Sequence, residues 1–127
     1  MNVESSRRFV VAVVDDDESV RESLPDLLRE CGYAAEAFAS AQELLDSGEL
    51  VRIGCLVLDL AMPGMSGPEL HQELRRRGQV VPIVFITATA DKTVRPHLLA
   101  QGAVDCLFKP FSDTALLAAI SAAEHVA

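Results

Sequence analysis

Short apolar runs, separated by helical patterns, constrain the fold of this chain more than any other feature. None of the four main runs alternates apolar with polar residues, and such runs form strands that are covered on both faces, as in parallel sheets. These runs are Phe9–Val14, Ile53–Leu58, Ile83–Ile86 and Val104–Phe108. A fifth run, Ala34–Phe38, contains Glu36 and is typical of an edge strand.

The segments between the runs have the start and stop signals of helices. Apolar residues at helical spacing lead to glycine stops at Gly32, Gly48, Gly78 and Gly102. Ser40 with Glu43, and Ser66 with Glu69, have the spacing of capping boxes, and Ser112 is a candidate N-cap for the last helix. This order predicts a doubly wound, flavodoxin-like α/β fold: a five-stranded parallel sheet in strand order 2-1-3-4-5 with helices on both faces.

Length and charge limit the possible partners. The 127 residues are enough for one domain, residues 1–127, and the formal net charge is −8. An acidic chain without a basic stripe is not expected to contact nucleic acid or an anionic membrane directly. No run is long enough to span a membrane, no signal peptide is recognisable, and the three cysteines lack close-pair spacing. We therefore predict a soluble, cytoplasmic protein with reduced cysteines.

Polar side chains follow the predicted strands at the points where the strands end. The residues are Asp15 and Asp16 after the first strand, Asp59 after the third, Thr87 after the fourth and Lys109 after the fifth. Because the carboxyl ends of parallel strands meet at one edge of the sheet, we expect the acids at 15, 16 and 59 to converge there. Ligands of open α/β sheets bind at this edge, so Asp59 is a candidate for a reactive residue.

Three clustered carboxylates repel one another and hold protons unless a cation neutralises them. Oxygen ligands without histidine or cysteine favour a hard ion, Mg²⁺ or alternatively Mn²⁺, which keeps open positions for phosphate oxygens. Asp59 can then attack phosphorus, as carboxylates do in aspartyl-phosphate enzymes. Lys109 is suited to pair with the phosphoryl oxygens, and the Thr87 hydroxyl can donate a hydrogen bond to another.

Four segments, in this order and spacing, resemble the receiver domains of two-component response regulators, and those of FixJ-type nitrogen-fixation regulators most of all. The segments are VVDDDESVRESL, VLDLAMPGMSG, ITATAD and DCLFKPF. The resemblance implies Mg²⁺ bound by the acid pocket of Asp15 and Asp16, by Asp59 and by the backbone carbonyl of Ala61. It also implies that Asp59 accepts phosphate from a sensor histidine kinase, and that the Lys109–Pro110 peptide bond is cis.

The same resemblance implies a role in transcription regulation for a chain that is not itself an enzyme. Phosphorylation would change the face formed by the fourth helix, the fifth strand and the fifth helix, and so control homodimerisation or an output partner. Any DNA contact would belong to an effector part outside these residues. One position departs from the family pattern, because Cys106 stands three residues before Lys109, where such receivers carry an aromatic ring that turns inward. We expect the signal to leave through the backbone after Thr87 instead.

Two other functions share parts of this pattern. A haloacid-dehalogenase-like phosphatase also uses an aspartyl nucleophile and Mg²⁺, but it usually has a second acid two residues later, where this chain has Ala61. A flavodoxin-like flavin carrier has the same fold, but its phosphate loop would be replaced here by three aspartates that repel a flavin phosphate. The sequence therefore favours the signalling module.

Overall fold

The computed structural model describes residues 9–126 of the chain. Strands and helices alternate along this range, as the pattern of apolar runs predicts. In chain order they are β1 (Val10–Val14), α1 (Glu18–Glu30), β2 (Ala34–Phe38), α2 (Ala41–Asp46), the short 3₁₀ helix η2 (Leu50–Arg52), β3 (Ile53–Asp59), α3 (Gly67–Arg76), β4 (Ile83–Thr87), α4 (Val94–Ala100), β5 (Asp105–Phe108) and α5 (Asp113–Val126). The helix η2 was not predicted. No helix of the described residues is long and apolar enough to cross a membrane.

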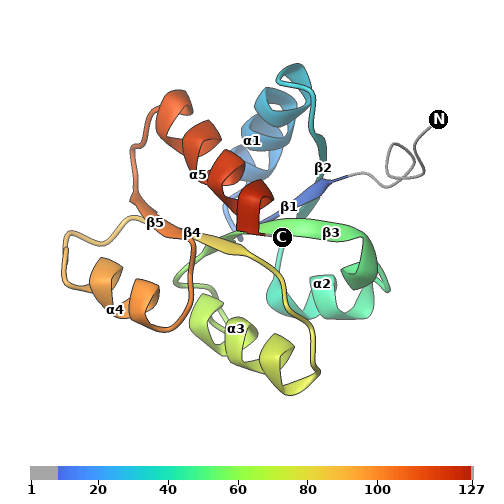
Figure 1. Cartoon of the computed structure of the whole chain (residues 1–127), viewed down its shortest axis with the longest axis vertical. Coiled ribbons are helices and arrows are strands. Elements are labelled where there is room, and N and C mark those ends of the chain that lie inside the picture. The colour runs from blue at the N-terminus through green and yellow to red at the C-terminus, as the bar shows by residue number, and fades with distance from the viewer. Residues whose placement is uncertain (1–8, 127) are drawn as a thin grey trace.

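The strands form one parallel sheet in the order β2-β1-β3-β4-β5, which confirms the predicted fold. Figure 1 shows α1 and α5 on one face of this sheet and α2, α3 and α4 on the other. All the strands run in the same direction, so their carboxyl ends lie together at one edge of the sheet. Their amino ends lie together at the opposite edge.

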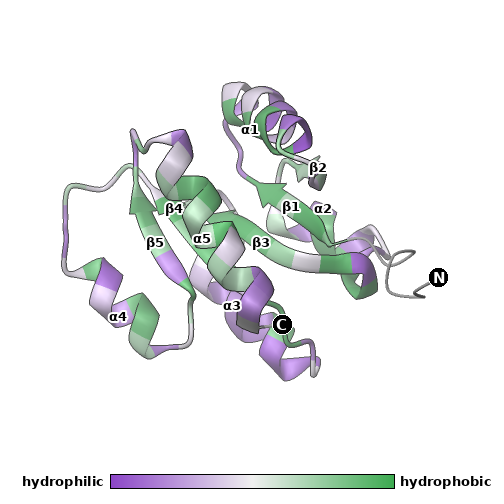
Figure 2. Ribbon diagram, turned by 45° about the horizontal axis from the view of Figure 1, so that its top comes forward, coloured by the Kyte–Doolittle hydropathy of each residue, from purple (hydrophilic) through white to green (hydrophobic). Residues whose placement is uncertain are grey.

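The core consists of two apolar layers, one on each face of the sheet. Along β3, Leu56 and Leu58 belong to the layer under α2, α3 and α4, whereas Cys55 and Val57 belong to the layer under α1 and α5. The helices contribute leucine and isoleucine to these layers, and Figure 2 shows apolar residues on the helix faces that turn toward the sheet. The fully buried leucine and isoleucine residues that they contribute are Leu28, Leu44, Leu70, Leu74, Leu116 and Ile120.

The strand β5 differs from its prediction. It begins at Asp105, and only Cys106 among its four residues is buried. By contrast, β1 and β4 are buried along their whole lengths. Because β5 is an edge strand, the two layers of helices cover it less completely than they cover the centre of the sheet, and complete burial was the wrong expectation.

The helix starts use the predicted serine caps, with one difference. The Ser66 hydroxyl accepts from the Glu69 N–H at 3.3 Å, and the Glu69 carboxylate accepts from the Ser66 N–H at 2.8 Å, so this capping box is confirmed. The Ser40 hydroxyl likewise accepts from the Glu43 N–H at 3.0 Å. The Glu43 carboxylate, however, accepts from the N–H of Ala39 at 2.9 Å. The second predicted box is therefore wrong in its reciprocal bond, which lies one residue earlier.

Candidate functional site

Asp15 follows β1 directly and is completely buried. The sheet fixes its backbone, because its N–H donates to the carbonyl of Phe38 at 3.1 Å. Its carboxylate accepts from the N–H of Asp17 at 2.9 Å and from the Lys109 ammonium at 3.1 Å. A buried carboxylate is tolerated when it is paired with a cation and hydrogen-bonded, and Asp15 meets both conditions.

Asp59 is the last residue of β3, and α3 begins close behind it. The N–H of Leu60 donates to the carbonyl of Ile86, and the N–H of Gly67 donates to the carbonyl of Leu60, both at 3.0 Å. A Cβ atom at position 67 would lie 2.5 Å from the backbone oxygen of Asp59. The start of α3 can therefore approach the strand end this closely only because residue 67 is glycine.

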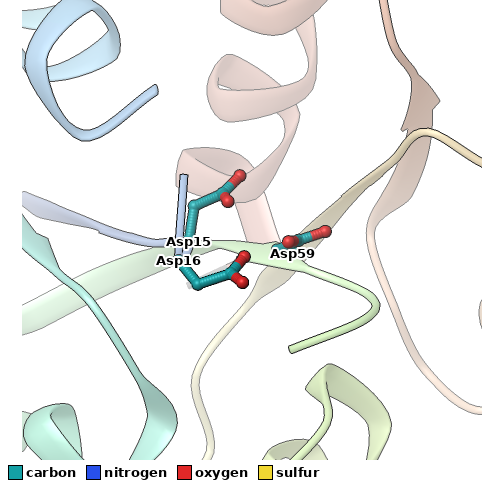
Figure 3. A group of neighbouring side chains, drawn as sticks. All are labelled: Asp15, Asp16 and Asp59. Carbon is teal, nitrogen blue, oxygen red and sulfur yellow. The ribbon is translucent and has the colours of Figure 1, made fainter. Parts of the chain in front are cut away.

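The structure brings three of the predicted site residues together at the carboxyl edge. Asp15, Asp16 and Asp59 each offer a carboxylate oxygen, and these oxygens lie within 4.8 Å of one another. Figure 3 shows the side chains of Asp15 and Asp16 reaching from the end of β1 toward Asp59 at the end of β3. Asp59 is only 7% exposed, whereas Asp16 is open to solvent. The cluster therefore has a buried side and an accessible side.

The surroundings of Asp59 favour its protonated form. Burial and the neighbouring Asp15 carboxylate raise the pKa of Asp59 to about 6, although Lys109 and a hydrogen bond from the backbone of Ala61 oppose the change. Burial disfavours a charge, and a like charge nearby disfavours it further. One lysine is thus not enough to compensate for two buried acids.

Asp17, the last of the three consecutive aspartates after β1, has a different role. Its side chain caps α1 by accepting from the N–H of Ser19 at 2.9 Å. Hydrogen bonds from Ser19 lower the pKa of Asp17. The side chain is therefore engaged at the helix start and does not belong to the cluster.

Thr87 and Lys109 complete the edge. Thr87 is 3% exposed, and its hydroxyl accepts from the N–H of Thr89 at 3.1 Å. The backbone N–H of Lys109 donates to the carbonyl of Thr87 at 2.7 Å, which fixes the end of β5 beside the end of β4. The Lys109–Pro110 peptide bond is cis, as the family resemblance implied. Ala61, whose carbonyl was the remaining predicted metal ligand, is exposed in the turn after Asp59.

The potential metal ligands at this edge fit a hard divalent cation. They are all oxygens, and the pKa of Asp59 is raised partly because Asp15 repels a second negative charge. A cation between the acids would remove that repulsion. Carboxylate-only sites with an accessible side are typical of Mg²⁺ and Mn²⁺.

Two residues of this region were not found by reasoning from the sequence. Arg21 of α1 donates from Nη1 to the carbonyl of Asp15 at 3.0 Å. No signal marks it, because an arginine in the first turns of a helix resembles any surface arginine. Gly67 did carry a signal: a glycine in the first turn of a helix is unfavourable unless another group approaches its Cα closely.

Cys106, the departure from the family pattern, is 1% exposed and lies in the apolar layer under α2, α3 and α4. Burial raises the pKa of its thiol. An aromatic ring is nevertheless present two residues later, where Phe108 packs against the same layer. The Lys92 ammonium lies over this ring, 3.8 Å from its centre. The β4–α4 connection is therefore held to the end of β5.

Residues 11–121 match the response regulator receiver domain. Nodulation protein W of Bradyrhizobium diazoefficiens is 43% identical over 122 residues, which are 96% of this chain and 54% of the relative. Transcriptional regulatory protein FixJ of Azorhizobium caulinodans is 43% identical over 112 residues, which are 88% of this chain and 53% of the relative. The chain thus spans about half the length of the curated relatives it matches.

Solved structures agree with these relatives. The response regulator StyR superposes with a TM-score of 0.86 at 44% sequence identity, covering 94% of this chain and 60% of that chain. FixJ-N superposes with a TM-score of 0.83 at 39% identity, covering 92% of this chain and 94% of that chain. The resemblance to FixJ-type regulators is confirmed, and the chain belongs to the response regulator receiver domain family.

Proposed function

We propose that the chain is a phosphoryl-accepting switch in which Asp59 receives the phosphoryl group from a phosphohistidine of a sensor histidine kinase. The side chains of Asp15, Asp16 and Asp59 and the carbonyl of Ala61 would hold Mg²⁺, with Mn²⁺ as the alternative. The main support is one observation: the three carboxylates lie within 4.8 Å of one another, in a chain of the receiver family. In this proposal residues 1–127 act as one receiver domain.

The chemistry needs an ionised Asp59. With a pKa of about 6, most of its carboxylate is charged at neutral pH. One of its oxygens attacks phosphorus, the P–N bond of the phosphohistidine breaks, and the leaving imidazole nitrogen takes up a proton. A bound divalent cation supplies charge neutralisation for the acids and for the phosphoryl oxygens. The remaining contribution of the chain is positioning, because phosphoryl transfer requires little covalent chemistry from the protein.

Two further residues would respond to the negative charge of the phosphoryl group on Asp59. A phosphoryl group adds about −1.5 to −2 charges at neutral pH. The Lys109 ammonium, now bound to Asp15, would turn toward the phosphoryl oxygens, and the Thr87 hydroxyl, which now accepts from Thr89, would donate to another of them. Both residues stand at the ends of β4 and β5.

Their new contacts would favour a second arrangement of the face formed by α4, β5 and α5. A switch of this kind needs only contacts that differ between two conformations. The altered face would then control homodimerisation or bind an output partner. The net charge of −8 supports a function in which these residues do not contact DNA themselves. The chain would act as a signalling module whose only chemistry is directed at its own Asp59.

The test is intact-mass measurement after incubation with acetyl phosphate and Mg²⁺. We expect the wild type to gain the mass of one phosphoryl group and Asp59→Asn to gain none. Asp17→Asn is the matched control: it lies beside the cluster but caps α1, so it should gain the group as the wild type does. Incorporation in the Asp59→Asn protein would place the acceptor elsewhere. Sedimentation of the same samples tests whether the phosphorylated form dimerises.

A further inference from the structure

A second site candidate lies at the opposite edge of the sheet. A cavity of about 800 Å³ opens at the amino end of β4, beside Ile83, where that strand begins. Its walls come from the end of α3, the α3–β4 and α4–β5 connections, and Ala122 of α5. The same strand ends with Thr87 at the carboxyl edge, where Asp59 lies. The length of β4 therefore separates this cavity from Asp59 and its neighbours, and none of the proposed phosphoryl chemistry uses it.

The lining of the cavity is mainly apolar. Its deepest residues, Leu74 and Ile83, are each 1% exposed, and Ala103 is 8% exposed. Val80, at its opening, is 96% exposed. The apolar surface that water reaches belongs to Val80 and to the half-buried Val81, Pro82 and Val104. Leaving this surface in water is unfavourable, so an apolar guest of matching size would be stabilised here.

One cation stands at the opening of this apolar space. Arg75 crosses the α4–β5 connection, where its Nη2 donates to the carbonyl of Gln101 and lies so close to Gly102 that a Cβ there would be 2.6 Å away. The guanidinium has further N–H donors beyond that one. Among residues 9–126, Arg75 forms no ion pair with a carboxylate, whereas its neighbours Arg76 and Arg77 both pair with Glu73.

A second polar side chain faces the same space. His71 lies one turn before Arg75 on α3 and is half-buried. Burial, together with the charge of Arg75, lowers the pKa of His71. The ring is therefore neutral at pH 7 and can take part in hydrogen bonds without adding charge. Arg75 alone supplies the positive charge at the cavity.

We propose that this cavity binds a small amphipathic carboxylate: an apolar body that packs on Val81, Pro82 and Val104, with its carboxylate on the guanidinium of Arg75. A carboxylate matches the fork of N–H donors on arginine, and the volume lies within the range of small-molecule sites. Arg75 is the only charged residue among those that line the cavity, so an anionic head group is the best complement to this opening. The inference does not depend on the chemistry of Asp59.

The probe is 4-phenylbutyrate, titrated into ¹⁵N-labelled, unphosphorylated protein while amide chemical shifts are recorded. We expect saturable shifts confined to residues 71–83 and 101–104, with a Kd of about 1 mM or tighter. The uncharged 4-phenylbutanamide has the same shape and should bind at least about tenfold more weakly. Equal affinity of the acid and the amide would overturn the proposal, as would shifts that do not saturate.

Three variants locate the site. Arg75→Gln should weaken binding of 4-phenylbutyrate about tenfold, whereas Arg77→Gln, which removes a neighbouring arginine that pairs with Glu73, should leave it unchanged. Ala122→Phe places a ring at an exposed residue of the cavity wall and should abolish binding without disturbing the core. Wild-type affinity in Arg75→Gln or in Ala122→Phe would exclude the cavity as the binding site. Equal losses of affinity in Arg75→Gln and Arg77→Gln would show that binding depends on the overall charge of this surface and not on a contact with Arg75, which would also overturn the proposal.

Discussion

The two edges of the sheet differ in what they bury. At the carboxyl edge lie Asp15, Asp59 and Thr87, which are the only buried polar or charged residues in the part of the chain that the structure describes. The amino edge is the reverse: it has the large exposed apolar residues Val51 and Val80 and an apolar cavity. The strands between the two edges are almost entirely apolar.

This difference teaches how stability and function are distributed along each strand. Burying a carboxylate is unfavourable unless it is paired, so the carboxyl edge weakens the metal-free fold. The apolar middle of each strand compensates for that loss. Variants of the buried acids and of the cation that pairs with them should therefore have effects that depend on charge and on Mg²⁺, and such dependence should be absent elsewhere.

Lys109→Ala should have the largest effect, because it removes the cation from the completely buried Asp15. We expect a loss of about 3 kcal/mol in the free energy of unfolding of the metal-free protein. Urea denaturation in EDTA measures it. Arg77→Ala, which breaks a partly exposed ion pair with Glu73, is the control and should change stability by less than about 1 kcal/mol.

The same experiment in Mg²⁺ separates charge from packing. A divalent cation among the acids would replace part of the charge that Lys109 supplies, so the loss should shrink. An equal loss in EDTA and in Mg²⁺ would mean that the lysine acts by packing, and the electrostatic account of this edge would be wrong.

Gly67→Ala should have the next largest effect. A methyl group there would lie 2.5 Å from the backbone oxygen of Asp59 and 3.0 Å from Cε1 of Phe85, so α3 would have to move. We expect a loss of about 2–3 kcal/mol, measured by urea denaturation. Gly64→Ala is the matched control: its φ is +79° and no atom lies within 4 Å of the added Cβ, so only backbone strain of about 1 kcal/mol remains. Equal losses would show that α3 retreats freely from the strand end.

Gly67 also illustrates what the sequence could and could not predict. The apolar runs and the capping serines predicted the strands, most helix starts and the strand order, because these depend on local pattern and on connection rules. The approach of Asp15, Asp16 and Asp59 followed from topology alone, since strand ends meet at one edge. The glycine at the start of α3 signals that some group approaches it closely, but only packing between segments shows that this group is the backbone of Asp59.

Three smaller features that the sequence did not predict also depend on packing between segments. The bond from Arg21 to the Asp15 carbonyl joins a helix to a strand end, and the partial exposure of β5 depends on how far the helix layers extend. The Glu43 carboxylate could reach either of two neighbouring N–H groups, and the observed choice of Ala39 depends on the direction in which the chain enters α2. Local patterns define which groups need partners, but tertiary geometry decides which partners they find.

The pH dependence of stability should report the burial of Asp59 and its repulsion by Asp15. Its pKa is raised to about 6, above the ordinary value of 3.8, so the folded protein holds a proton that the unfolded chain has lost between these values. Stability of the metal-free protein should therefore fall as pH rises from about 4 to about 6 and stay low above that. Asp59→Asn should remove this fall and be more stable than the wild type by about 2 kcal/mol at pH 7.5.

Urea denaturation of both proteins in EDTA, across pH 3.5 to 7.5, isolates the contribution of this one group as the difference between the two curves. The difference should be small at the acid end of the range. Mg²⁺ should reverse its sign at neutral pH, because only the ionised carboxylate binds the cation. Curves that run parallel across the range would show that neither burial nor the Asp15 carboxylate raises the pKa of Asp59 in the folded protein.

Lys92→Met should have the smallest effect on stability. It tests whether the carboxyl edge is sensitive to its overall charge or to the burial of Asp15. Lys92 and Lys109 are both cations near the carboxyl edge, but Lys92 is exposed and lies over the ring of Phe108 at 3.8 Å. Methionine keeps the apolar contact and removes the charge, so the loss should be about 0.5 kcal/mol and should not depend on Mg²⁺. A loss as large as that of Lys109→Ala would assign the sensitivity of this edge to its overall charge. A small loss assigns it to the burial of Asp15, because the two lysines differ mainly in the groups they compensate.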